Sequence, residues 1–167
     1  LNKGQIPFFE PGLSELVTQC IADLRLTFTD SLPDAVAHGD VLIIGVGTPP
    51  LSSGAADTSQ VLAAAHAIGV NLQRFATVVV KSTVPVGTSV QVAHAVQAGI
   101  EQSGSRTQFA VASNPEFLKE GDAVRDFMQP DRIVVGASDE RAIQMLTQLY
   151  EPLCTHENAL MVMNEQS

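Results

Sequence analysis

Two carboxylates that could work together, Glu116 and Glu120, lie four positions apart in the segment 113–121, just after a short apolar run. If this segment forms one helical turn, both carboxylates lie on the same face. A carboxylate at a strand end, close to the apolar side chains of Phe117 and Leu118, could have a raised pKa and serve as a general base. The alternative is structural, because acidic residues stabilise the first turn of any helix. On these residues alone, the structural alternative is favoured.

Two further segments end apolar runs with residues suited to a bound ligand. Residues 46–50 (Val-Gly-Thr-Pro-Pro) combine a glycine, which lets a ligand approach closely, with two prolines that fix the direction of the chain. Residues 81–88 (Lys-Ser-Thr-Val-Pro-Val-Gly-Thr) offer a cation and hydroxyls before a helix, where a polar ligand or an ordered water could be held. The structural alternatives are a stiff turn for the first segment and a helix capped by Thr88 for the second.

The elements that position these three segments follow from the hydrophobic pattern. The predicted strands are 25–29, 41–46, 77–80, 109–112, 133–135 and 160–162, and helices are predicted over 13–21, from 31 onward, and over 58–73, 88–103 and 139–150. Strands that are apolar on both faces and alternate with helices indicate a parallel sheet covered on both sides. The sequence therefore predicts a doubly wound α/β domain whose ligand binds beyond the carboxyl ends of the strands.

Composition excludes several classes of function. The 167 residues carry a net charge of −9 and have a pI near 4.7, which opposes nucleic-acid binding but allows a phosphate-bearing ligand held by backbone N–H groups. Cys20 and Cys154 are far apart and form no metal or disulfide pattern, so we expect structural thiols, with Cys20 buried, and no metal. No apolar run reaches the ~20 residues that span a bilayer, so no membrane partner is expected.

Five segments, in this order, resemble UDP-glucose 6-dehydrogenases of the UDP-glucose/GDP-mannose dehydrogenase family. They are residues 1–13, 47–50, 81–88, 114–121 and 127–136. The resemblance implies the NAD-binding domain of such an enzyme, with a Rossmann-like fold, and an oxidation of the C6 alcohol of UDP-glucose to a carboxylate by two molecules of NAD. It also implies a cytoplasmic enzyme that forms a homodimer or a larger assembly.

The resemblance assigns roles to particular residues. Those expected to contact NAD are Val46, Gly47, Thr48, Pro49, Pro50, Ser82, Thr83 and Val84, with Glu120 near the nicotinamide. Glu116 is expected to act as the general base, while the Thr83 hydroxyl helps to hold a water. The sugar-nucleotide site is expected to be lined by Glu116, Phe117, Leu118, Lys119 and Glu120. These roles suit the reaction, because a hydride leaves C6 only as a base takes the hydroxyl proton.

Two alternatives remain open for the function. GDP-mannose and UDP-N-acetylmannosamine dehydrogenases look similar across this domain, although residues 117–120 and 130–133 resemble the UDP-glucose branch more closely. A non-catalytic nucleotide-binding or assembly module is the second alternative.

The sequence departs from the family by what it lacks. No Gly-x-Gly-x-x-Gly occurs in it, and the family places that turn before Leu1 and its nucleophilic cysteine and a catalytic lysine beyond Ser167. We therefore expect residues 1–167 to be part of an NAD-binding domain that lacks its first strands and the substrate domain, and to be inactive alone. Without the neighbouring strand, the edge of the 41–46 strand would be open, which favours self-association.

Overall fold

The computed structural model describes residues 1, 5–154, 156 and 159–164. Within them, five strands form one sheet in the order β1-β2-β3-β4-β5. The strands are β1 (Val41–Ile44), β2 (Ala76–Val80), β3 (Phe109–Ser113), β4 (Ile133–Ala137) and β5 (Leu160–Met163). The first three run parallel, β4 is antiparallel to β3, and β5 is parallel to β4. The doubly wound α/β fold is confirmed, but a sheet with all strands parallel is not, because the chain re-enters the sheet at β4 in the opposite direction.

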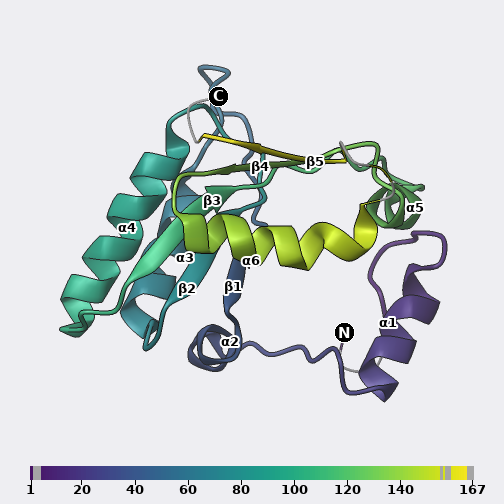
Figure 1. Ribbon diagram of the computed structural model, residues 1–167, viewed down its shortest axis with the longest axis horizontal. Coiled ribbons are helices and arrows are strands. Elements are labelled where there is room, and N and C mark those ends of the chain that lie inside the picture. Colours follow the sequence, from purple (N-terminus) through teal and green to yellow (C-terminus); the bar gives the residue numbers. More distant parts are fainter. Residues whose placement is uncertain (2–4, 155, 157–158, 165–167) are drawn as a thin grey trace.

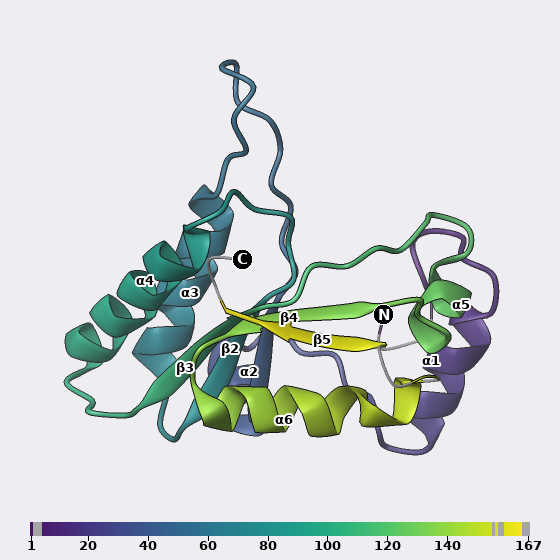
Figure 2. The same cartoon turned by 45° about the horizontal axis from the view of Figure 1, so that its top comes forward.

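Helices cover both faces of this sheet. They are α1 (Leu13–Ala22), α2 (Leu32–His38), α3 (Ser59–Asn71), α4 (Thr88–Ser103), α5 (Ala123–Met128) and α6 (Glu140–Tyr150), followed by a 3₁₀ turn, η1 (Glu151–Leu153). Helices α3 and α4 lie side by side on one face, and α6 lies on the other (Figure 1). Helices α1 and α5 lie together at one end of the molecule, away from the main sheet (Figures 1 and 2).

Strand β2 shows why the pattern of the sequence produces this arrangement. All five of its residues are buried, because alternate side chains enter opposite hydrophobic cores. Val78 and Val80 pack towards α3 and α4, whereas Val79 packs towards α6. On the first face, α3 and α4 cross so closely that a Cβ on Gly69 would lie 2.1 Å from the Val96 carbonyl oxygen.

The predicted strand over 25–29 is wrong. The backbone amides of Arg25 and Leu26 donate to the carbonyl oxygen of Cys20, at 2.9 and 3.1 Å, and so help to end α1. Leu24 has a φ of 57° and is 90% exposed, so the apolar alternation that suggested a strand has no sheet to face. Cys20, expected to be buried, is only half-buried.

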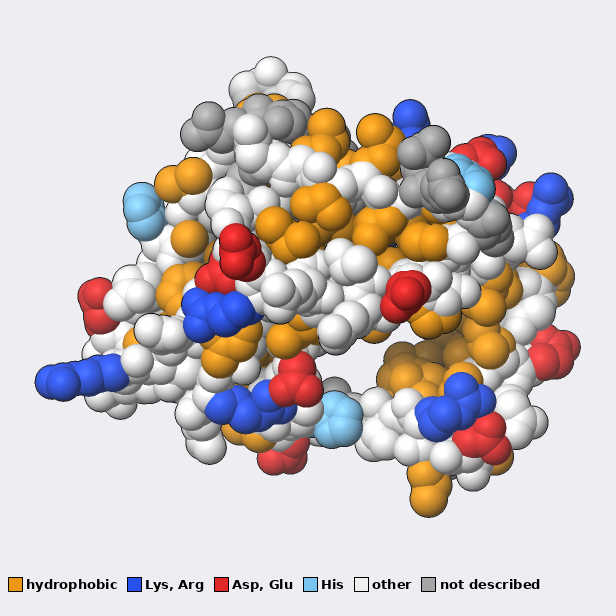
Figure 3. Space-filling model, viewed as in Figure 1, with side chains coloured by type: hydrophobic (Ala, Val, Ile, Leu, Met, Phe, Trp, Pro, Cys, Tyr) orange, Lys and Arg blue, Asp and Glu red, His pale blue; other side chains and the backbone are white. Residues whose placement is uncertain are grey.

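Strand β1 forms one edge of the sheet. Among the described residues it pairs with β2 only, and its Ile43 side chain is 51% exposed. Figure 3 shows a hollow between the part of the molecule formed by α1 and the part formed by α2, with hydrophobic side chains on its wall. The open apolar edge expected from the sequence is therefore present, while self-association through it stays a prediction. In the described part of the chain, no helix is long and apolar enough to cross a membrane.

Candidate active site

The carboxyl ends of the three parallel strands meet at one edge of the sheet. Ile44 of β1 lies opposite Val80 of β2, and Val80 lies opposite Ser113 of β3. The three segments singled out in the sequence lie at these strand ends: 46–50 begins two residues after Ile44, 81–88 directly after Val80, and 113–121 at Ser113 itself. The sheet therefore brings together residues that are far apart in the chain, at the edge where ligands bind in doubly wound folds.

Hydrogen bonds join the first two of these loops. The Ser82 hydroxyl donates to the carbonyl oxygen of Val46 at 2.6 Å, and the Thr48 hydroxyl donates to the carbonyl oxygen of Thr83 at 2.9 Å. The two groups of residues expected to hold NAD are thus in contact. Beyond Pro50, which pairs with Ala56 in a single bridge, the first loop projects well away from the sheet (Figure 2).

The surface formed by these loops is open at its glycines. A Cβ placed on Gly45 or Gly47 would meet nothing within 4 Å, so a flat ligand can approach the backbone there. Gly47, Pro49 and Thr83 are exposed, which leaves their backbone and hydroxyl groups accessible to a ligand. This edge of the sheet therefore leaves open space beside the backbone of Gly45 and Gly47.

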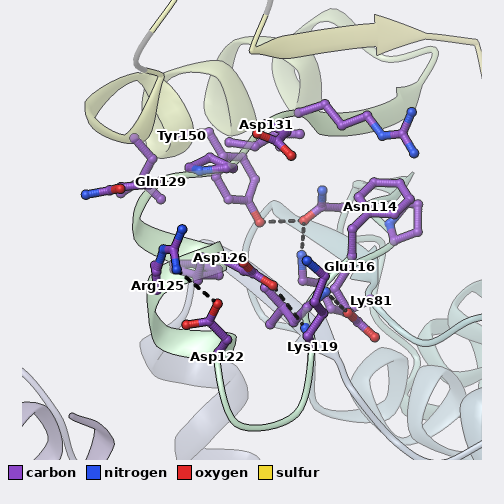
Figure 4. A pocket seen from close by; sticks show the side chains of 18 residues that line it. Lys81, Asn114, Glu116, Lys119, Asp122, Arg125, Asp126, Gln129, Asp131 and Tyr150 are labelled. Carbon is purple, nitrogen blue, oxygen red and sulfur yellow. Dashed lines mark hydrogen bonds and ion pairs between the residues drawn. The ribbon is translucent and has the colours of Figure 1, made fainter. Parts of the chain in front are cut away.

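A cavity of about 550 Å³ lies next to these loops, beyond the end of β3. Its walls come from the loop after β3, from α5, from the segment leading into β4, and from the end of α6 (Figure 4). Of the expected substrate residues, Glu116, Phe117, Leu118 and Lys119 line the cavity, but Glu120 does not. Lys81, which directly precedes the second cofactor loop, also lines it, and so connects the cavity to that loop.

The helical turn that would align Glu116 with Glu120 does not form. Residues 114–119 have no regular structure, and Gly121 adopts a left-handed φ of 85°. The Glu116 carboxylate instead accepts a hydrogen bond from the backbone N–H of Leu118 at 2.7 Å. Such a local bond between a side chain and the backbone competes with helix formation. The two carboxylates therefore do not share a helical face, and Glu120 is exposed outside the cavity.

The floor of the cavity is a polar network that the sequence did not indicate. Asn114 is fully buried, and its amide nitrogen donates to the carbonyl oxygen of Val134 at 2.8 Å. Its amide oxygen accepts from the Lys81 ammonium at 3.0 Å and from the Tyr150 hydroxyl (Figure 4). Burial lowers the pKa of Lys81, although the charge of Glu116 opposes this shift, and burial raises the pKa of Tyr150. The position of Asn114 directly after β3 was the only signal for this network.

The rim of the cavity is held by interactions from both sides. The Arg132 guanidinium stacks 4.7 Å from the centre of the Phe117 ring. Glu10, from the segment before α1, accepts hydrogen bonds from the backbone N–H groups of Gly121 and Ala123, both at 2.8 Å. The N-terminal part of the chain therefore holds the loop that carries Glu116. Residues this far apart give no local pattern, so sequence reasoning could not pair them.

The sequence is similar to those of known proteins. Residues 1–154 match the model of the UDP-glucose/GDP-mannose dehydrogenase family, NAD binding domain. The chain is 50% identical over 163 residues to a UDP-glucose 6-dehydrogenase of Rhizobium meliloti, an alignment that covers 96% of this chain and 36% of that protein.

Two solved structures share the fold over 99% of this chain and 38% of theirs. A UDP-glucose dehydrogenase from Pyrobaculum islandicum is 44% identical with a TM-score of 0.89, and a GDP-mannose dehydrogenase from Pseudomonas aeruginosa is 32% identical with a TM-score of 0.87. The chain spans about a third of the length of the curated relatives it matches.

Proposed function

The chain belongs to the UDP-glucose/GDP-mannose dehydrogenase family, as its NAD binding domain, and we propose that it serves an enzyme that oxidises UDP-glucose to UDP-glucuronate. The observation that carries the proposal is the placement of a cavity containing a carboxylate, Glu116, directly beside two joined loops that fit a nucleotide. An alcohol dehydrogenase needs both parts next to each other, because the carbon that loses the hydride must lie against the cofactor.

We propose the following roles for the residues of the two loops and the cavity. The loops 46–50 and 82–84 hold NAD, which accepts a hydride from C6 when it is bound. Glu116 accepts the proton of the C6 hydroxyl, and the exposed Thr83 hydroxyl holds a water. Residues 117–119 contact the sugar nucleotide, and Glu120, which lies outside the cavity, contacts the nicotinamide side.

Similarity supports UDP-glucose as the substrate. The 50% identical relative is named a UDP-glucose 6-dehydrogenase, whereas the GDP-mannose dehydrogenase of known structure is 32% identical. Oxidation of another nucleotide sugar is the second candidate, because the fold is the same in both. We further propose that residues 1–167 work as one part of a longer, dimeric or larger cytoplasmic enzyme and do not turn over substrate alone.

NADH formation tests the proposal. The complete gene product is incubated with NAD and, separately, with UDP-glucose, GDP-mannose or UDP-N-acetylmannosamine, and NADH absorbance is followed. We expect the highest kcat/KM with UDP-glucose and a loss of kcat of about 10²-fold or more in Glu116→Gln, the usual contribution of a general base. Faster oxidation of another nucleotide sugar would overturn the assigned substrate. NADH formation by the 167-residue chain alone would overturn its dependence on further residues.

NAD binding by the 167-residue chain gives a test that does not depend on turnover. Chemical-shift changes on addition of NAD should map to residues 46–50 and 82–84, and Gly47→Val should weaken binding because the new side chain fills the space beside the loop. Shift changes confined to other parts of the chain would contradict the cofactor assignment.

A further inference from the structure

Glu10 connects the N-terminal segment to the wall of the cavity through both oxygens of its carboxylate. One oxygen accepts the backbone N–H of Gly121 and the other accepts that of Ala123, both at 2.8 Å. These partners lie 111 and 113 residues further along the chain. Hydrogen bonds to an ionised carboxylate are stronger than those between neutral groups. The contact therefore holds the wall at two points rather than one.

The two amides belong to a tight turn between the loop after β3 and α5. Gly121 has a left-handed φ, and the backbone N–H of Asp122 donates to the carbonyl oxygen of Lys119 at 3.1 Å. Ala123 begins α5, and the side chain of the residue before it, Asp122, does not cap the helix. Because α5 has only six residues, it depends on contacts with the rest of the protein for its stability. Glu10 supplies such a contact at the first residue of the helix.

Both sides of this turn face the proposed sugar-nucleotide site (Figure 4). Lys119 lines the cavity before the turn, and Asp122 and Asp126 line it after the turn. The backbone N–H of Lys119 donates to the Asp126 carboxylate at 3.1 Å, which ties the loop to α5. A displacement of the turn would therefore move the loop and the helix together.

Glu10 is itself held in place by α1. The backbone N–H of Leu13, the first residue of α1, donates to the carbonyl oxygen of Glu10 at 3.1 Å, and Pro11 restricts the chain between them. Val17 of α1 is buried, and α1 lies with α5 at one end of the molecule (Figures 1 and 2). The carboxylate therefore reaches the turn from the start of a packed helix.

We propose that Glu10 is a positioning residue for the sugar nucleotide: through the amides of Gly121 and Ala123, it holds residues 117–119 and α5 where they contact that ligand. The other end of the loop is held separately, because the side chain of Asn114 bonds to Val134 on β4. Glu10 should therefore affect residues 117–119 more than it affects Glu116. The inference rests on the proposed function for the identity of the ligand, whereas the hold of Glu10 on the wall is independent of it.

Hydrogen exchange tests this hold without any need for activity. Exchange in the complete gene product is followed by mass spectrometry, in peptides that cover 116–120 and, for comparison, β2. Glu10→Gln keeps the length of the side chain but has one acceptor oxygen, so it cannot serve both amides. We expect exchange in 116–120 to become about 3- to 10-fold faster and exchange in β2 to stay unchanged. Unchanged exchange in 116–120 would overturn the inference, whatever the substrate is.

Steady-state kinetics separate a positioning role from a general loss of stability. Glu10→Gln should raise KM for UDP-glucose about 5- to 10-fold and change kcat by no more than about twofold, because a binding contact present throughout the reaction is lost. KM for NAD should stay the same, because loops 46–50 and 82–84 do not include the partners of Glu10. An equal rise in both KM values, or an unchanged KM for UDP-glucose, would overturn the inference.

Glu15→Gln is the matched control. Glu15 is an exposed acidic residue in the first turn of α1, so this variant removes the same charge close by without touching the turn. Its exchange rates and both KM values should equal those of the unchanged enzyme. A rise in KM for UDP-glucose as large as that in Glu10→Gln would assign the effect to net charge and overturn the inference.

Gly121→Ala gives a second route to the same turn, and it decides the matter if Glu10→Gln does not fold. A Cβ there meets nothing within 4 Å, so alanine acts only by disfavouring the left-handed φ. It should also raise KM for UDP-glucose and not KM for NAD. In the double variant the two effects should be less than multiplicative, because both loosen one turn. Fully multiplicative effects would show that Glu10 acts elsewhere.

The two tests fail in different ways from the proposed function. If the complete gene product oxidises another nucleotide sugar, the assigned substrate is wrong, and KM for that nucleotide sugar tests Glu10 instead. If it oxidises none of them, the proposed function fails, and hydrogen exchange alone decides whether Glu10 holds the wall.

Discussion

Replacing Gly69 by alanine should destabilise the protein, because α3 and α4 cross without room for a side chain. A Cβ at this position would lie 2.1 Å from the carbonyl oxygen of Val96 and 2.9 Å from its carbonyl carbon. The obstacle is helix backbone, which cannot rotate away as a side chain can. The helices would have to separate by roughly 1 Å to reach even a tight contact, against the close packing of a protein interior.

The expected magnitude follows from two opposing effects. Ile68 and Val96 are buried in the core that both helices share with the sheet, so separating the helices loosens that core. Overpacking of this kind costs about 1–3 kcal/mol, and a backbone obstacle places Gly69→Ala at or above the upper end. Alanine gains about 1 kcal/mol of helix propensity over glycine. The net loss of about 2 kcal/mol should lower Tm by about 4–8 °C in a domain of this size.

Thermal unfolding followed by circular dichroism measures this change. Gly45→Ala is the matched control, because a Cβ there meets nothing within 4 Å, and it should change Tm by no more than about 1 °C. A Gly69→Ala chain that melts at or above the temperature of the unchanged chain would refute the close crossing of α3 and α4. A weakened affinity for NAD should accompany the loss of stability, since α4 begins at Thr88, shortly after the proposed cofactor loop 82–84.

Three other changes test separate parts of the structure. Thr48→Val removes the hydrogen bond to Thr83. This variant should bind NAD about 2- to 10-fold more weakly in calorimetry, while its Tm stays nearly unchanged. An unaltered affinity would show that the joined loops are not the cofactor surface. Glu10→Ala should raise the hydrogen-exchange rates of the two backbone amides that it accepts from by about tenfold, whereas equal rates would mean that the contact does not hold the loop. A hydrogen bond from the Arg141 side chain lowers the pKa of Asp139 below its usual value of 3.8. The contribution of the charged Asp139 to the stability of the folded state is therefore present above that pH, and it is lost as the pH falls through the lower, folded-state pKa. Asp139→Asn should therefore lower Tm at neutral pH but not near about pH 2, and a pH-independent difference would contradict this origin.

The fold could be predicted from the sequence where burial decides the structure. Strand β2 is rich in valine and, apart from Thr77, apolar because it is covered on both faces, and α6 carries an apolar stripe because only one of its faces is covered. The segment 25–29 shows the limit of such reasoning. Its alternation of apolar and polar side chains resembles that of a strand. However, the backbone N–H groups of its first two residues donate to the carbonyl oxygen of Cys20 and so help to end α1. A pattern of side chains does not reveal such backbone hydrogen bonds.

The site could be predicted only to the level of loops. The three loops were found because they follow apolar runs, and the parallel strands bring them together as expected. The geometry within them depends on partners from distant elements, such as Tyr150 on α6, which touches Asn114. The local bond from the Leu118 N–H to the Glu116 carboxylate likewise favours an irregular loop over the helical turn that the spacing of Glu116 and Glu120 allowed. Neither contact has a spacing that could be recognised in a sequence.

The reversal of direction between β3 and β4 also bears on how such a binding site can diverge. Ala112 and Ser113 pair with Ala137 and Gly136, so β4 begins well beyond the end of β3, on the side of the cavity. The chain therefore leaves the sheet and returns to it on the same side, and residues 114–132 form most of the wall as one uninterrupted stretch. Natural selection, or an engineer, can exchange or lengthen that stretch as a cassette, altering which ligand is accepted while the sheet and the loops at β1 and β2 are inherited unchanged.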